Sequence, residues 1–118
     1  MTIYCFDIDG TICDTPESNY HLSTPIFERI KVVNELFEAG HEIHFFTARG
    51  AATGIDWREL TEMQLQSWGL KYHKLLMGKP HADVFIDDKA MSDIAFFSSI
   101  WAIRISWAKT FACQFLKC

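Results

Sequence analysis

The sequence predicts an α/β fold of the Rossmann-like, three-layer type, with a central and mainly parallel sheet. Short β-prone apolar runs alternate with stretches in which apolar residues recur at helical spacing, the pattern of strands joined by crossover helices. Polar residues also recur just after several of the expected strands. With 118 residues, of which 49% are hydrophobic, the chain has material for one compact core, and we expect a single domain over residues 1–118.

The net charge, the N-terminal stretch and the cysteine pattern limit which partners and metals the sequence indicates. A net charge of −4 provides no basic face for nucleic acid and no polybasic membrane anchor. The apolar stretch at the N-terminus is too short for a signal peptide or a membrane-spanning helix. None of the four cysteines stands in a C-x-x-C pair, so no zinc site is indicated. We therefore expect a cytoplasmic protein that binds neither membranes nor, given its acidity, nucleic acid.

The first half of the chain contains two expected strands and one helix. Ile3–Phe6 is an apolar, β-prone run and predicts the first strand, followed by an irregular loop over residues 12–23. Thr24 is expected to cap a helix with Pro25 at its first position, and Gly40 to end that helix. The next apolar run, residues 42–46, predicts the second strand.

The second half continues the alternation. After a glycine-flanked loop over residues 49–54, Asp56 and Glu59 resemble a capping box that begins a helix over residues 57–68. The remaining expected elements are strands at 72–77 and 84–86, a short helix at 90–97, a strand at 100–105 and a helical tail at 107–118.

Two acids mark the end of the first strand. Asp7 and Asp9 stand two residues apart, so in an extended chain their side chains project to the same side. Carboxylates held this close raise each other's proton affinity unless a cation lies between them. The pair therefore indicates a divalent metal, a shared proton, or both.

Other polar residues follow the later strands in the same way: Thr47 ends the second, Lys79 follows the third, and Asp87 and Asp88 end the fourth. In open parallel sheets, ligands bind at the edge formed by the carboxyl ends of the strands. Four separate segments would thus bring acids, a hydroxyl and an ammonium group to one edge.

These segments resemble the four motifs of the haloacid dehalogenase superfamily, in the usual order. The matching segments are FDIDGT at 6–11, FT at 46–47, GKP at 78–80 and FIDD at 85–88. A narrower resemblance, to bacterial capsule-biosynthesis phosphatases, rests on FTARG at 46–50, GIDW at 54–57 and IDDKA at 86–90. The spacing between the motifs leaves no room for a cap domain.

The resemblance implies a phosphatase. Asp7 would attack phosphorus and form an aspartyl-phosphate, and Asp9 would act as general acid and then as general base. The implied cofactor is Mg²⁺, with ligands from Asp7, the backbone carbonyl of Asp9, Asp87, and Asp88 directly or through water. The implied phosphate-binding residues are Gly10, Thr47, Ala48 and Lys79.

The resemblance also implies a small phosphorylated substrate, such as a sugar or polyol phosphate of surface-polysaccharide synthesis. The alternatives are a 3′-phosphatase that acts on nucleic-acid ends and a catalytically silent binding domain. Arg49 either contacts the substrate or pairs with Asp56 or Glu59 on the surface. Without a cap domain, water must be excluded from the site by the loop over residues 12–23, by a second subunit or by a large substrate. The aromatic C-terminal tail either supplies a homo-oligomer surface or closes the core.

Overall fold

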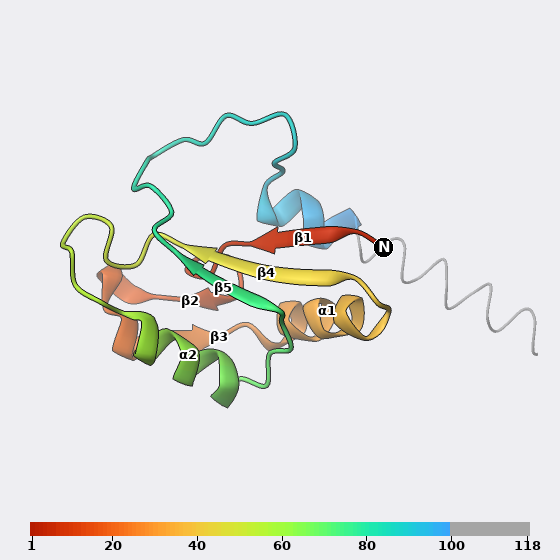
Figure 1. Cartoon of the computed structure of the whole chain (residues 1–118), viewed down its shortest axis with the longest axis horizontal. Helices are drawn as coiled ribbons and strands as arrows, with labels where there is room; N and C mark the ends of the chain where they lie inside the picture. Colours follow the sequence, from red (N-terminus) through yellow and green to blue (C-terminus); the bar gives the residue numbers. More distant parts are fainter. Residues whose placement is uncertain (100–118) are drawn as a thin grey trace, which may run out of the picture. The chain divides into compact units, whose positions relative to one another are not determined.

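The computed structural model describes residues 1–99 (Figure 1). The chain divides into two compact units, Met1–Val84 and Phe85–Cys118, and each is described by itself. The single domain expected over residues 1–118 stays a prediction. Within residues 1–99, no helix is long and apolar enough to cross a membrane.

The first unit is built on a parallel sheet of three strands, β1 (Ile3–Phe6), β4 (Glu42–Thr47) and β5 (Lys74–Met77), in the order β1-β4-β5. Phe45 of β4 aligns with Phe6 on one side and with Leu75 on the other. Because all three strands run the same way, their carboxyl ends meet at one edge of the sheet (Figure 1). The predicted α/β fold with a central parallel sheet is confirmed.

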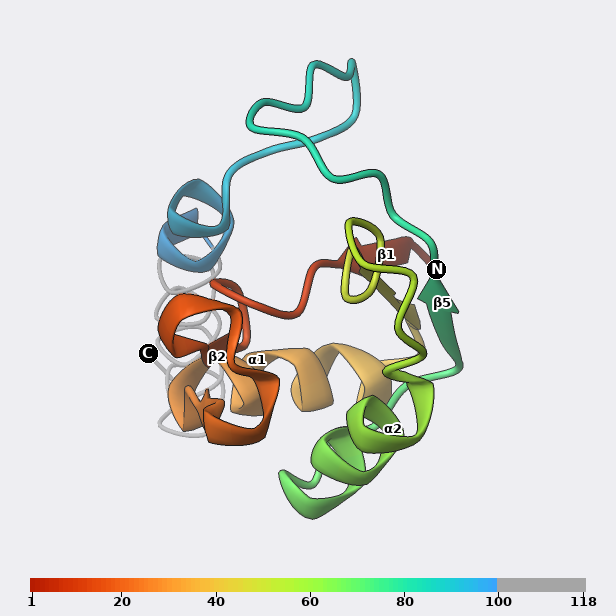
Figure 2. The same cartoon turned by 90° about the vertical axis from the view of Figure 1, so that its left-hand side faces the viewer.

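Two helices connect the strands and lie on the same side of the sheet (Figures 1 and 2). They are α1 (Phe27–Glu38), between β1 and β4, and α2 (Arg58–Ser67), between β4 and β5. This placement follows from the right-handed crossover that parallel strands prefer, applied twice in the same direction. α1 ends as predicted, with Gly40 at a φ of +94° that other residues adopt only with strain.

The core lies between the sheet and these helices. α1 buries Ile30, Val32, Val33 and Leu36, which face the fully buried Ile43 and Phe45 of β4. Ile8 and Ile12, on either side of the first turn, are also fully buried. The strand tip that carries Asp7 and Asp9 is therefore anchored by one apolar side chain between the two acids and a second one three residues after Asp9.

The segment between β1 and α1 differs from the prediction. Thr24 and Pro25 do not open the helix: they form the short strand β3 (Thr24–Pro25), which pairs antiparallel with β2 (Cys13–Asp14). The Ile26 N–H donates to the Ile12 carbonyl at 2.9 Å, and α1 begins only at Phe27. Tertiary pairing thus overrides the local capping preference. The expected loop also contains two 3-10 helices, η1 (Pro16–Ser18) and η2 (Tyr20–Leu22).

The fourth predicted strand, residues 84–86, is wrong: this described segment forms no strand, and Ile86 is 96% exposed. Three apolar residues become a strand only when a neighbouring strand pairs with their backbone. In the second unit, the predicted short helix is present over residues 93–99, where the Ser92 hydroxyl accepts from the Ala95 N–H at 3.1 Å. The strand predicted at 100–105 and the helical tail at 107–118 lie outside the described residues.

Candidate active site

Three of the predicted site residues meet at the carboxyl edge of the sheet. Asp7 directly follows β1, and Thr47 ends the adjacent strand β4. Lys79 lies two residues beyond β5, and its N–H donates to the Thr47 carbonyl at 3.0 Å. The three side chains thus come from three neighbouring strand ends, as the sequence predicted.

Asp7 and Lys79 form an ion pair at this edge. The Lys79 Nζ lies 3.5 Å from Asp7 Oδ1, and both side chains are partly exposed. Burial raises the pKa of Asp7 above its usual value, and the positive charge of Lys79 counteracts this only in part. A further cation beside Asp7 would lower that pKa and favour the ionised carboxylate that a nucleophile requires.

Asp9 has a different partner. Both of its carboxylate oxygens accept from Arg49, Oδ2 from Nε at 2.9 Å and Oδ1 from Nη2 at 2.8 Å. Thr15 donates a further hydrogen bond to Oδ1. Burial alone would raise the pKa of Asp9, but the hydrogen bonds from Arg49 and Thr15 outweigh it, so the pKa lies below its usual value.

The two acids differ in their surroundings. The resemblance implies that Lys79 and a bound metal keep Asp7 ionised while the side chain of Asp9 carries the proton, and both roles stay predictions. Of these two acids, Asp9 has a pKa below its usual value and Asp7 a pKa above it. The reason is geometric: Arg49 binds Asp9 with two hydrogen bonds, whereas Lys79 faces Asp7 at the longer distance of 3.5 Å.

The surface pairing expected for Arg49 is wrong, and its contact with a substrate stays a prediction. Its side chain is fully buried, and it pairs with Asp9 rather than with Asp56 or Glu59. No spacing in the sequence connects residues 9 and 49. One signal was available on α2: Thr61, Gln64 and Leu65 recur at helical spacing, which places two polar side chains beside an apolar one on the inward face.

The predicted phosphate-binding residues are partly engaged within the protein. The Thr47 side chain is buried, and its hydroxyl accepts from the Arg49 N–H at 3.1 Å. The Gly10 N–H donates to the Cys13 carbonyl at 2.8 Å, which closes the turn after β1. Ala48 is half-buried and its carbonyl accepts from the Ala51 N–H at 2.9 Å. Lys79 is the one charged residue among these four candidates, and its ammonium group pairs with Asp7.

Asp87 and Asp88 belong to the second unit, and their role as metal ligands stays a prediction. There, the Asp87 carboxylate accepts from the Lys89 N–H at 3.0 Å. Across residues 1–99, no three His, Cys, Asp or Glu side chains are grouped closely enough to hold a metal ion. Within the first unit, the carboxylate of Asp7 and the backbone carbonyl of Asp9 are hard oxygen donors of the kind that Mg²⁺ prefers.

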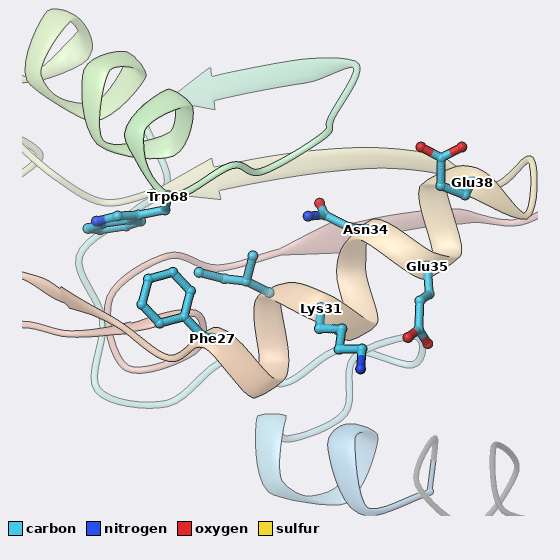
Figure 3. Close-up of a pocket in the computed structure, with 7 residues that line it drawn as sticks. Phe27, Lys31, Asn34, Glu35, Glu38 and Trp68 are labelled. Carbon is cyan, nitrogen blue, oxygen red and sulfur yellow. The ribbon is translucent and has the colours of Figure 1, made fainter.

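A groove of about 480 Å³ lies elsewhere, along α1 (Figure 3). Phe27 and Trp68 line one end, and Lys31, Glu35 and Glu38 extend toward the other. The groove shares no residue with the carboxyl edge of the sheet. It is therefore not the site that the sequence predicted.

Comparisons with known proteins support the fold. The chain is similar to the crystal structure of an MCSG target from Vibrio cholerae, with a TM-score of 0.74 and 27% identity over 81% of this chain and 87% of that one. Two similar chains come from structures of the Pnkp1/Rnl/Hen1 RNA repair complex: TM-score 0.52 with 22% identity, and TM-score 0.51 with 20% identity. The first match covers 74% of this chain and 30% of the other chain. The second match covers 88% of this chain and 31% of the other chain. No protein-family profile and no curated protein sequence matches the chain.

Proposed function

We propose that the chain is a phosphomonoesterase in which Asp7 is the nucleophile. The observation that carries the proposal is the ion pair between Asp7 and Lys79, 3.5 Å apart at the carboxyl edge of a parallel sheet. A carboxylate beside an ammonium group suits attack on a phosphoryl group, because the lysine offsets the charge of both the nucleophile and the phosphoryl oxygens. The motif resemblance to the haloacid dehalogenase superfamily agrees with this chemistry.

The proposed reaction has two steps. A carboxylate oxygen of Asp7 forms a bond to phosphorus while the bond to the leaving oxygen breaks, and Asp9 supplies the proton that the leaving oxygen takes up. A water molecule, which loses its proton to Asp9, then attacks the phosphorus of the aspartyl-phosphate and releases phosphate and free Asp7. The lowered pKa of Asp9 favours its ionised form, which suits the second step and works against the proton donation of the first.

Mg²⁺ is the proposed cofactor. The carboxylates of Asp7 and Asp87 and the backbone carbonyl of Asp9 would hold it, with Asp88 as a further ligand. Positive charge from bound Mg²⁺ would offset the phosphoryl oxygens and lower the pKa of Asp7, which burial raises. The proposed substrate is a small phosphorylated metabolite such as a sugar or polyol phosphate. No comparison supports the more specific role in capsule synthesis.

A second candidate is a 3′-phosphatase that acts on nucleic-acid ends. The fold likeness to chains of an RNA repair complex favours it, although that likeness extends to the fold alone. The net charge of −4 counts against it, because nucleic-acid binding draws on basic side chains that contact the phosphate backbone.

Hydrolysis of p-nitrophenyl phosphate with and without Mg²⁺ tests the proposal. We expect turnover that requires Mg²⁺, is lost in Asp7→Asn, and is retained in the matched control Asp14→Asn, an exposed acid on β2. Absence of turnover with several divalent metals, or full activity in Asp7→Asn, would contradict it. Sugar phosphates and 3′-phosphorylated oligonucleotides, assayed side by side, then separate the two substrate classes.

A further inference from the structure

The guanidinium of Arg49 uses every hydrogen-bond donor it has. Nε and Nη2 bind the Asp9 carboxylate, and Nη2 also donates to the Ser23 hydroxyl at 3.3 Å. Nη1 donates to the Thr61 hydroxyl at 3.1 Å and to Gln64 Oε1 at 2.6 Å. An arginine side chain has five N–H donors, and these five contacts account for all of them. No donor is left for an anionic substrate.

Gln64 on α2 holds Arg49 and the segment before α1 at the same time. Its Oε1 accepts from Arg49, and its Nε2 donates to the Tyr20 carbonyl at 2.6 Å. The Tyr20 ring lies under the guanidinium, 4.7 Å from the Arg49 Cζ. Tyr20 is thus held from two sides, by a backbone hydrogen bond and by its ring.

The ends of this segment are also fixed close to Asp9. Thr15 donates to the Asp9 carboxylate, and its hydroxyl lies 2.6 Å from the Ser23 hydroxyl, which accepts from Arg49. One side chain therefore connects the acid, the segment over residues 15–23 and α2. Removing Arg49 would break its own contacts with all three, and would leave only the Thr15–Asp9 and Gln64–Tyr20 hydrogen bonds described above.

We propose that Arg49 is a positioning residue: it fixes the orientation of the Asp9 carboxylate and fastens residues 15–23 beside the site, and Gln64 sets the orientation of Arg49. The kinetic part of this inference rests on the proposed function, in which Asp9 acts on the leaving oxygen and on water. A general acid or base is effective only when held in reach of the reacting atoms, and small displacements reduce rates strongly.

Lysine cannot replace arginine in this role. Its ammonium group is a single point of charge, whereas the planar fork of arginine binds both carboxylate oxygens and still reaches Thr61, Gln64 and Ser23. Arg49→Lys therefore keeps the charge and loses the geometry. Gln64→Met tests the same arrangement from α2, since it leaves Arg49 present with one partner missing.

The kinetic experiment compares these variants with wild type on p-nitrophenyl phosphate. We expect kcat to fall about 100-fold in Arg49→Lys and Arg49→Ala, and about tenfold in Gln64→Met, with KM within about twofold. Millimolar guanidinium should restore part of the kcat of Arg49→Ala. The matched control is Arg58→Ala, which removes a half-exposed arginine paired with Glu62 and should neither lose kcat nor respond to guanidinium.

A second measurement is independent of catalysis. Amide hydrogen exchange of the full chain should show faster exchange across residues 15–23 in Arg49→Lys and Gln64→Met than in wild type, and no change in Arg58→Ala. If wild type hydrolyses no phosphomonoester, the proposed function fails. Amide hydrogen exchange then still tests whether Arg49 and Gln64 hold residues 15–23 in place. Wild-type kcat in Arg49→Lys, or unchanged exchange across residues 15–23, would overturn the inference.

Discussion

Arg49 and Asp9 lie 40 residues apart in the chain, and their side chains meet in a pair of parallel hydrogen bonds of 2.9 and 2.8 Å. The arginine side chain is fully buried, and that of Asp9 is 27% exposed. A charge buried to this degree depends on its partner, because the loss of one member leaves the other without compensation. The pair thus matters for stability whether or not the chain is an enzyme.

The first prediction follows from this pair. Asp9→Ala should lower the free energy of unfolding by about 3–5 kcal/mol at neutral pH, because it leaves the guanidinium of Arg49 buried and unpaired. Urea unfolding of wild type and variant measures the difference. Asp14→Ala removes an exposed acid and is the control, with an expected change within about 0.5 kcal/mol. If Asp9→Ala also changes the free energy of unfolding by no more than about 0.5 kcal/mol, the pair of Asp9 and Arg49 does not stabilise the fold.

The second prediction concerns pH. Because the pKa of Asp9 is lower in the folded chain than in the unfolded chain, the unfolded state binds more protons between the two values. The stabilisation from Asp9 is therefore present above its unfolded pKa, about 3.9, and is lost as the pH falls through the folded value. Unfolding free energies measured from pH 6 downward should fall less steeply in Asp9→Asn than in wild type. Equal slopes would show that Asp9 is not held as an anion.

The third prediction concerns the loop after β4. At Gly50, with φ at +83°, an added Cβ would lie 2.1 Å from the Ile55 carbonyl oxygen, so Gly50→Ala must displace backbone. Gly54 has a similar φ of +74° and open space around it, so Gly54→Ala adds only the backbone strain of about 1–2 kcal/mol. Thermal denaturation should show the larger loss for Gly50→Ala. Equal losses would mean that the loop adapts without cost.

The fourth prediction concerns Lys79. Lys79→Met removes the positive charge 3.5 Å from Asp7 while keeping much of the side-chain length. If Lys79 offsets the phosphoryl charge, kcat should fall about 100- to 1,000-fold, the loss seen when one stabilising donor is removed from a transition state. Lys74→Met, on the exposed start of β5, is the control. An unchanged kcat in Lys79→Met would exclude Lys79 from the proposed chemistry.

The parts of the fold that could be predicted are those governed by local pattern. β1, β4, β5 and α2 follow from short apolar runs, helical periodicity and breaker residues, and the structure places each within two residues of its predicted bounds. Asp7, Thr47 and Lys79 could be placed together because parallel strands align their carboxyl ends.

The failures have a common physical cause, which is pairing between distant segments. Thr24 and Pro25 carry a good helix-start signal, yet they pair with Cys13 and Asp14 as strands. The run at residues 84–86 has β-prone side chains and no strand partner among the described residues. Arg49 reaches Asp9 across the fold, a contact that no local spacing encodes.

If Asp7 is the nucleophile, its carboxylate becomes phosphorylated during turnover. Enzyme mixed with excess p-nitrophenyl phosphate and Mg²⁺, acid-quenched and reduced with borohydride, converts any aspartyl-phosphate to homoserine, which peptide mass spectrometry locates. We expect homoserine at position 7, none at positions 9 or 14, and none anywhere in Asp7→Asn. Phosphate release from wild type without homoserine at position 7, or with homoserine at another aspartate, would contradict it.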